Sequence, residues 1–230
     1  MNYRRYTRRN LKPGFFDFFR NLSITGWIIL INVILFIVAI FVGAYSSPNC
    51  NETACKFLAL APSNILQGKY LWTLLTSMFM HANFTHLFVN MISLMFIGSF
   101  VEKIVGRKRF LWFYLAAGLI AGLTFVFLAL IFNAELNIYA VGASGAIFGL
   151  GGLLMILTPK LPVLVFFVIP MPMWIAMLFL LFVLWGVSIW ANIPIGNTAH
   201  LGGLLVGVVY GVYLRQKYKR KITMLNRFFR

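Results

Sequence analysis

The chain has 230 residues, of which 61% are hydrophobic and only 10% are charged, and its formal net charge is +16. Soluble domains carry about 25% charged residues, so the composition excludes an ordinary soluble domain. The apolar stretches are continuous rather than alternating, which argues against a membrane β-barrel. We therefore predict an all-α membrane protein that folds as one compact helical bundle.

Six apolar runs have the length and composition expected of transmembrane helices, which need about 20 residues. They cover residues 27–45, 86–104, 110–132, 144–157, 173–190 and 199–213. Residues 162–172 are apolar too, but Pro162, Pro170 and Pro172 would break a helix there. We interpret that stretch as a short connector against the bilayer surface. The prediction is a bundle of six transmembrane helices.

The distribution of positive charge predicts the orientation. Eighteen of the 20 basic residues fall on one side of the six runs, and only Lys56 and Lys69 fall on the other. Because cytoplasmic loops are enriched in lysine and arginine, both termini are predicted to be cytoplasmic. The expected organisation is a basic cytoplasmic segment over residues 1–26, a six-helix domain over residues 27–214 and a basic cytoplasmic tail over residues 215–230.

The same charge raises the question of a nucleic-acid partner. No aromatic and basic binding module accompanies it, so we expect none. The basic segments are better explained as topology determinants and contacts to anionic lipid of the bilayer. The first apolar run is too long for a cleavable signal peptide, so we interpret it as a signal anchor. These features predict a multi-pass protein of the cell membrane.

The outer loop after the first run holds both cysteines, Cys50 and Cys55. A disulfide between them is plausible in an oxidising space, and two free thiols fit equally well. Asn51 and Asn83 match the glycosylation pattern, which occurs often by chance and decides nothing here.

Three polar side chains stand at the starts of apolar runs. With a cytoplasmic N-terminus the second, fourth and sixth runs begin on the outer side, where the chain has His86, Ser144 and His200. Polar groups inside such segments are costly unless they face a protected interior. A serine and a histidine at matched depth are the minimum parts of a nucleophile and its base. We therefore predict that Ser144 and His200 form a catalytic dyad.

Glycines indicate how the fourth and sixth runs could meet. Gly145 and Gly149 are four residues apart, and Gly203, Gly207 and Gly211 repeat that spacing. Small residues at this interval let membrane helices approach closely, which would bring His200 towards Ser144. The fourth run, at about 1.5 Å per residue, is shorter than the bilayer core of about 30 Å, so Ser144 is expected below the outer surface. The alternative is that the glycines only pack and Ser144 is one more small interface residue.

Histidines near the second run allow other interpretations. His86 and Asn90 are four apart and share a helical face, with His81 just upstream. Such residues taken alone more often hydrogen-bond across helices than take part in catalysis. A zinc site would need three or four ligands, and no carboxylate or cysteine lies at a suitable depth. We expect neither a metal nor any other cofactor.

Taken together, the motifs resemble those of the rhomboid intramembrane serine proteases over nearly the whole chain. The resemblance rests on the cluster from His81 to Asn90, on Gly98-x-x-x-Glu102-x-x-x-Gly106, on Gly142-Ala143-Ser144-Gly145, and on Ala199-His200 with Gly203 and Gly207. It implies hydrolysis of peptide bonds within or beside the transmembrane segments of membrane protein substrates. The family often has a Trp-Arg pair in the loop before the histidine cluster, where this chain has Trp72-Thr73, so the loop lacks that arginine as an anchor.

The resemblance also implies roles for individual residues. Ser144 would be the nucleophile and His200 its general base, while His86, Asn90 and the Ser144 N–H would stabilise the oxyanion. Phe148, one turn after Ser144, is expected to stack on His200. The supporting residues would be His81, Gly142 and Gly145.

The acidic residues do not complete a triad. None of the four carboxylates has a defined link to His200, which favours a dyad. We interpret Glu102 as a structural hydrogen-bond acceptor at the inner end of the second run.

Two alternatives remain open. A non-proteolytic relative that escorts other helices would normally lack the serine or the histidine, and both are present. A small transporter would be expected to show an inverted repeat or a pair of broken helices, and neither is evident. No oligomeric state is predicted.

Overall fold

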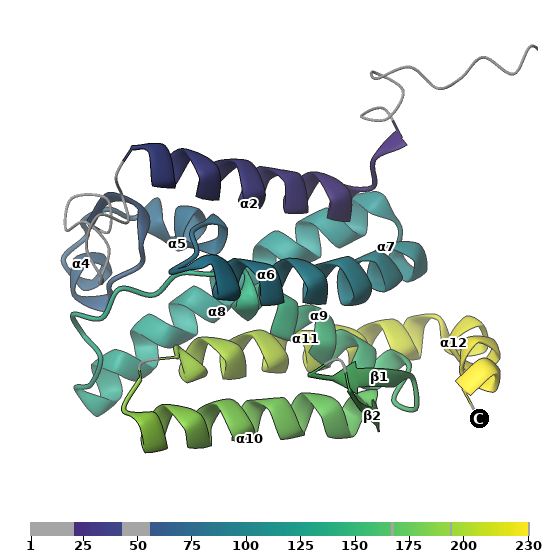
Figure 1. Cartoon of the computed structure of the whole chain (residues 1–230). Coiled ribbons are helices and arrows are strands. Elements are labelled where there is room, and N and C mark those ends of the chain that lie inside the picture. The colour runs from purple at the N-terminus through teal and green to yellow at the C-terminus, as the bar shows by residue number, and fades with distance from the viewer. Residues whose placement is uncertain (1–20, 43–55, 167, 194, 230) are drawn as a thin grey trace, which may run out of the picture.

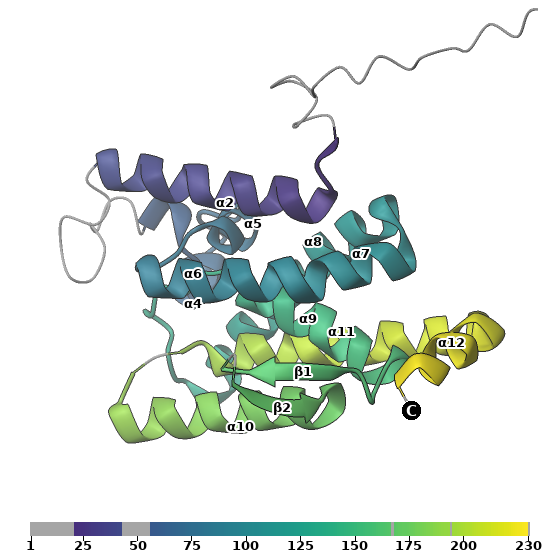
Figure 2. The same cartoon turned by 45° about the vertical axis from the view of Figure 1, so that its right-hand side comes forward.

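The computed structural model describes residues 21–42, 56–166, 168–193 and 195–229. Its helices lie side by side in a bundle, with α2, then α6 and α7, then α9 and α11, and finally α10 following one another across the molecule (Figures 1 and 2). Helix α6 continues through one π-helical segment, η2 (Leu94–Gly98), into α7. The main helices are α2 (Ile24–Phe41), α6 (Phe84–Ser93), α7 (Ser99–Val105), α8 (Arg107–Phe132), α9 (Ser144–Leu157), α10 (Met173–Ala191) and α11 (Asn197–Lys217).

Five of the helical segments in the described part of the chain are long and apolar enough to cross a membrane. They are Ile24–Phe41, Phe84–Val105, Arg107–Phe132, Met173–Ala191 and Asn197–Lys217, and the apolar helix Ser144–Leu157 is shorter. The prediction of a helical, multi-pass membrane protein is confirmed. Helix bounds differ slightly from those expected: α2 begins at Ile24 and α11 continues to Lys217.

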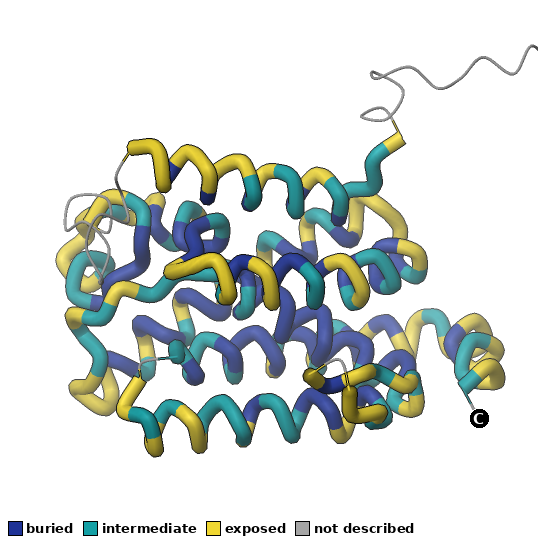
Figure 3. Tube along the Cα trace, in the orientation of Figure 1, coloured by how far each residue is buried: buried dark blue, intermediate teal, exposed yellow. Residues whose placement is uncertain are grey.

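Helix α9 forms the centre of the bundle. Eleven of its 14 residues are buried, and it packs against α8, α10 and α11. Figure 3 shows this central region in dark blue, whereas α2 and α10 turn many exposed residues outwards. A helix that is apolar all round is stable only where other helices or lipid surround it. The short α9 is therefore covered mainly by protein, and the exposed apolar faces of α2 and α10 are suited to lipid.

Helices α9 and α11 touch along their glycines. A Cβ added to Gly203 would overlap the carbonyl oxygen of Gly145, and one added to Gly207 would overlap that of Gly149. A Cβ on Gly149 would come within 2.6 Å of the Cβ of Ala117 in α8. The backbones of α9 and α11 can approach this closely only because no side chain intervenes. This contact determines how the starts of the two helices lie relative to each other.

Residues 162–172, predicted as a connector, form a small hairpin. Strand β1 (Pro162–Val165) pairs antiparallel with β2 (Ile169–Pro172), with Pro162 opposite Pro172 and Leu164 opposite Pro170. The prolines prevent a helix here but are tolerated in a two-stranded ribbon, where many N–H positions need no partner.

The basic tail also has regular structure. After α11 the chain turns at Tyr218 into α12 (Lys219–Asn226) and a short 3₁₀ turn, η3 (Arg227–Phe229). The side-chain amide of Asn226 donates to the Leu157 carbonyl at 2.7 Å. Because the last carbonyls of a helix have no intrahelical donor, this bond caps the end of α9. The tail is thereby tied to the central helix.

The loop before the histidine cluster holds two short helices, α4 (Pro62–Leu66) and α5 (Thr73–Thr76), and a 3₁₀ turn, η1 (Ser77–Phe79). The indole N–H of Trp72 donates to the Phe57 carbonyl at 2.8 Å, and the ring of Tyr70 meets both aromatic rings edge-on. Thr73 is fully buried. These contacts hold the loop around Thr73. Cys50, Cys55, Asn51 and the basic residues before Asn21 lie outside the described residues.

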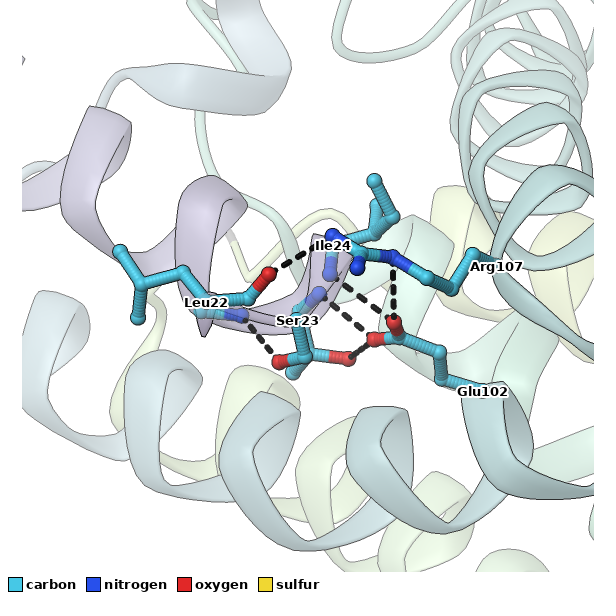
Figure 4. A network of polar contacts seen from close by, with 7 residues as sticks. Leu22, Ser23, Ile24, Glu102 and Arg107 are labelled. Atoms are coloured by element: carbon cyan, nitrogen blue, oxygen red, sulfur yellow. Dashed lines mark hydrogen bonds and ion pairs between the residues drawn. The ribbon is translucent and has the colours of Figure 1, made fainter. Parts of the chain in front are cut away.

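Glu102 joins the start of α2 to the junction of α7 and α8 (Figure 4). Its carboxylate accepts from the backbone N–H of Ile24 at 2.9 Å, and from the backbone N–H and hydroxyl of Thr25 at 2.8 and 2.7 Å. Arg107, the first residue of α8, lies 3.8 Å from the same carboxylate and donates to the Leu22 carbonyl. A carboxylate at a helix N-terminus accepts hydrogen bonds from the free N–H groups there, and its negative charge is stabilised by the positive end of the helix dipole. Glu102 therefore acts as a structural acceptor that fastens α2 to α7 and α8.

Candidate active site

Ser144 and His200 lie in the first turns of α9 and α11, 56 positions apart in the sequence. The hydroxyl of Ser144 is 2.8 Å from Nε2 of His200, which is hydrogen-bonding distance. His200 is 4% exposed, whereas Ser144 is partly exposed. Ser144 is therefore the more accessible of the two residues, and His200 is the buried one.

The ring of Phe148 covers His200. The two rings are stacked with centroids 4.5 Å apart and an angle of 15° between their planes, and both side chains are buried. Phe148 lies one turn after Ser144 in the same helix, so α9 supplies both the hydroxyl and the surface that orients the imidazole.

The backbone immediately before Ser144 depends on glycine. Gly142 has φ of +124°, a conformation that side chains rarely adopt, and its N–H donates to the Ser77 carbonyl at 2.8 Å. A Cβ on Gly142 would lie 2.9 Å from Nε2 of His86 and 3.7 Å from the hydroxyl of Ser144. The imidazole and the hydroxyl therefore border the same small space above Gly142.

His86 lies in the first turn of α6, and two hydrogen bonds there orient it. The Asn83 side chain caps α6 by accepting from the His86 N–H at 2.8 Å. The Ala82 N–H approaches Nδ1 of His86 at 3.4 Å. If Nδ1 accepts that bond, the proton of the neutral ring sits on Nε2, the atom that faces Gly142.

The other two residues of the cluster support this arrangement. His81, which precedes α6, is buried and meets His86 edge-on with ring centroids 5.2 Å apart. Burial, with a smaller contribution from His86, lowers the pKa of His81 to about 3, so this ring is neutral at ordinary pH. Asn90 donates from Nδ2 to the His86 carbonyl at 2.9 Å, within its own helix. Within the described residues, no hydrogen bond joins Asn90 to Ser144 or His200.

The start of α9 offers free donors. Its first intrahelical bond runs from the Ile147 N–H to the Ala143 carbonyl at 3.0 Å. The N–H groups of Ser144, Gly145 and Ala146 therefore have no acceptor in their own helix. Such groups at a helix N-terminus favour an anion.

Asn197 is a residue that the sequence reasoning missed. Its side-chain oxygen and Nδ1 of His200 are both buried and, within the described residues, have no hydrogen-bond partner. The two residues are three positions apart in the first turns of α11 and so share a face. The three-residue spacing between Asn197 and His200 is the feature of the sequence that could have identified Asn197. Neither described carboxylate takes the place of a third member: Glu102 is bound to α2, and Glu135 lies in the loop after α8.

Nothing in the described part of the chain resembles a metal centre, since no three histidine, cysteine or carboxylate side chains gather there. The features that do gather are a serine, a buried histidine stacked on an aromatic ring, a second histidine and free helix amides. Their chemistry is that of nucleophilic attack on a carbonyl group.

Comparison with known proteins agrees with this arrangement. Residues 68–217 match the model of the rhomboid domain, and the chain belongs to the rhomboid family. It is 28% identical over 204 residues to Rhomboid protein 1, mitochondrial, of Saccharomyces cerevisiae, covering 84% of this chain and 56% of that protein. It is 42% identical over 106 residues to the rhomboid protease GluP of Bacillus subtilis, covering 45% of this chain and 19% of that protein.

A further relative is Rhomboid-like protease 3 of Toxoplasma gondii, 26% identical over 208 residues, covering 89% of this chain and 72% of that protein. The chain thus spans just over half of the yeast relative and about a fifth of the Bacillus one. Two of these relatives are named proteases, and the residues that match the rhomboid domain include Ser144 and His200.

Proposed function

We propose that this protein is an intramembrane serine protease that cleaves transmembrane segments of membrane protein substrates near the outer side of the bilayer. The observation that carries the proposal is the distance of 2.8 Å between the Ser144 hydroxyl and Nε2 of His200, at the starts of two apolar helices. Membership of the rhomboid family supports the same reaction class.

In the proposed reaction His200 takes the proton of the Ser144 hydroxyl as Oγ attacks the carbonyl carbon of the substrate. The resulting tetrahedral intermediate breaks its C–N bond, and the proton on Nε2 passes to the departing amine. Water then attacks the acyl-serine ester, again losing a proton to His200, and releases the carboxylic acid and the free hydroxyl. Phe148 keeps the imidazole in the plane that this exchange requires.

The negative oxygen of the intermediate would occupy the space above Gly142. Nε2 of His86 and the Ser144 hydroxyl border that space, and the N–H groups at the start of α9 follow Gly142 directly in the chain. Donors placed in advance where charge develops lower the barrier more than flexible ones. Asn90 would contribute only if its amide turned from the His86 carbonyl on substrate binding, and Asn197 would position His200 through a bridging water.

The proposed topology has six crossings, with both termini in the cytoplasm of a cell membrane. Helix α9, at 14 residues, is about 21 Å long against a hydrocarbon core of about 30 Å. Because it is surrounded by other helices, its short length is tolerated, and its start with Ser144 would lie below the outer surface. The basic ends of the helices lie at the opposite end of the bundle from Ser144.

The test is cleavage of a reconstituted helical substrate by wild type, Ser144→Ala and His200→Ala. We expect both variants to lose cleavage, at least 10³-fold for a nucleophile or its base. Ser93→Ala in α6 is the matched control and should cleave normally. A fluorophosphonate probe should label wild type and the control but not Ser144→Ala. Cleavage by Ser144→Ala at the wild-type rate would refute the proposal.

A further inference from the structure

A cavity lies at the end of the bundle opposite Ser144 and His200. It has a volume of about 390 Å³ and is enclosed by α7, the start of α8, the ends of α9 and α11, and α12. In Figures 1 and 2 the end of α7 and α12 lie at the same end of the molecule. This volume is within the range of about 300–1,000 Å³ that is usual for small-ligand sites. The proposed protease chemistry makes no use of it.

The cavity has an apolar floor and a basic rim. The floor is formed by the buried side chains of Val105, Leu157, Leu214 and Ile222, which come from four different helices. The rim carries three exposed cations, Lys103, Arg109 and Lys221, from α7, α8 and α12. Cations from three separate elements therefore converge on one apolar hollow.

These cations have no acidic partners among the described residues, where the one ion pair joins Arg107 to Glu102. The guanidinium of Arg109 lies over the ring of Tyr218 at 5.7 Å. A ring contact of this kind holds the planar guanidinium while leaving its N–H edge free for a phosphate. The rim is thus a preformed site for a group with negative charge.

We propose that this cavity binds an anionic phospholipid of the cytoplasmic leaflet. The phosphate would bind Lys103, Arg109 and Lys221, and the first part of an acyl chain would lie on the apolar floor. A soluble anion would use the rim but not the floor, and a neutral lipid would use the floor but not the rim. Basic pockets between membrane helices on the cytoplasmic side are suited to such head groups.

Helix α12 closes the site and connects it to the rest of the protein. Ile222 contributes to the floor of the cavity, and Leu225 forms the wall on that side. The helix is held by the bond from Asn226 to the Leu157 carbonyl and by the edge contact of Phe229 with Phe100. Bound lipid would therefore favour the docked position of α12, and its absence would leave the end of α9 less firmly capped.

The test compares full-length variants in nanodiscs of phosphatidylcholine with and without phosphatidylglycerol. The rim variant, Lys103→Gln/Arg109→Gln/Lys221→Gln, removes three cations and keeps long side chains. Its control, Lys108→Gln/Arg215→Gln/Arg220→Gln, removes the same charge from exposed neighbours that do not line the cavity. A third variant, Leu225→Gln, alters the wall without changing charge. Retention of phosphatidylglycerol by native mass spectrometry and thermal stability are measured.

We expect wild type and the control to retain phosphatidylglycerol and to be stabilised by it, and the rim variant to retain it at least about tenfold less. Leu225→Gln should also weaken retention. Equal loss in the rim variant and the control would overturn the proposal, since it would indicate general attraction to an anionic surface. So would stabilisation by inorganic phosphate alone, or by phosphatidylcholine to the same degree. None of these readouts depends on cleavage, so the proposed protease activity is tested separately.

Discussion

The imidazole of His200 lies flat against the ring of Phe148, with centroids 4.5 Å apart. The same imidazole lies 2.8 Å from Ser144, one helical turn before Phe148 in α9. Helix α9 thus determines both the position of the hydroxyl and the plane of the base that would activate it. Among the described residues, no acidic side chain bonds to Nδ1 of this ring.

Replacing Phe148 by leucine tests this relationship. Aromatic pairs contribute about 0.5–1.5 kcal/mol beyond burial, so we expect Phe148→Leu to lower kcat by about two- to tenfold. Phe127→Leu, at an exposed position of α8, is the control and should leave kcat unchanged. Rates of substrate cleavage and of fluorophosphonate labelling should fall together. A kcat equal to that of wild type would show that the stacking does not orient the base.

Gly142→Ala tests the space proposed for the oxyanion. The new Cβ would lie 2.8 Å from Cε1 of His86 and would force the imidazole to move. Gly68→Ala is a matched control, because Gly68 also has positive φ but a Cβ there would meet no atom within 4 Å. Oxyanion donors are worth about 10²–10³ in kcat, so we expect a loss of that order for Gly142→Ala alone. Equal kcat in the two variants would argue against the assigned space.

Gly203→Ala tests the contact of α9 with α11. The added methyl group would overlap the backbone carbonyl of Gly145, which has no freedom to move aside. Overpacking of this kind typically destabilises by about 1–3 kcal/mol, so we expect a lower unfolding temperature in detergent. Separation of the helices should also reduce cleavage. Gly186→Ala in α10, where a Cβ meets nothing within 4 Å, should leave both measurements unchanged. A Gly203→Ala protein as stable as wild type would contradict this interpretation.

Glu102→Gln tests the junction of α2 with α7 and α8. The amide keeps the shape of the carboxylate but loses its charge and can accept through only one oxygen. Hydrogen bonds to charged groups contribute about 1.5–3 kcal/mol, so the free energy of unfolding should fall by about that amount. Cleavage by the folded fraction should persist, since Glu102 bonds to Ile24, Thr25 and Arg107 and to no residue of the candidate site. Glu135→Gln, in the loop after α8, should be neutral; equal losses in both variants would show that the network is not specific.

Much of this protein could be predicted from features that are local in the sequence. The apolar runs predicted a helical membrane protein. In lipid, each segment must hydrogen-bond its own backbone N–H and C=O groups, so the argument applies to each run separately. Ser144 and His200 stood out because a polar residue at the start of such a run is unusual in itself. The glycine spacing in α9 and α11 predicted a close approach of those two helices, which is what their backbones make.

Other features depended on residues distant in the sequence. The carboxylate of Glu102 meets the start of α2, 77 and 78 positions away, and no pattern around either residue indicates the partner. The hairpin at residues 162–172 and the docked α12 arise because neighbouring helices offer them a surface. Asn197 became a candidate only because the structure shows that its side-chain oxygen and Nδ1 of His200 are both buried without a hydrogen-bond partner among the described residues.

The amino-acid sequence by itself determined which segments favour lipid and which polar groups are placed among them, because hydrophobicity and charge act residue by residue. Only the tertiary structure decided that the Ser144 hydroxyl and Nε2 of His200 are 2.8 Å apart, and that three cations surround an apolar hollow at the other end. Both depend on how closely whole helices pack, which is the sum of many contacts between residues distant in the chain.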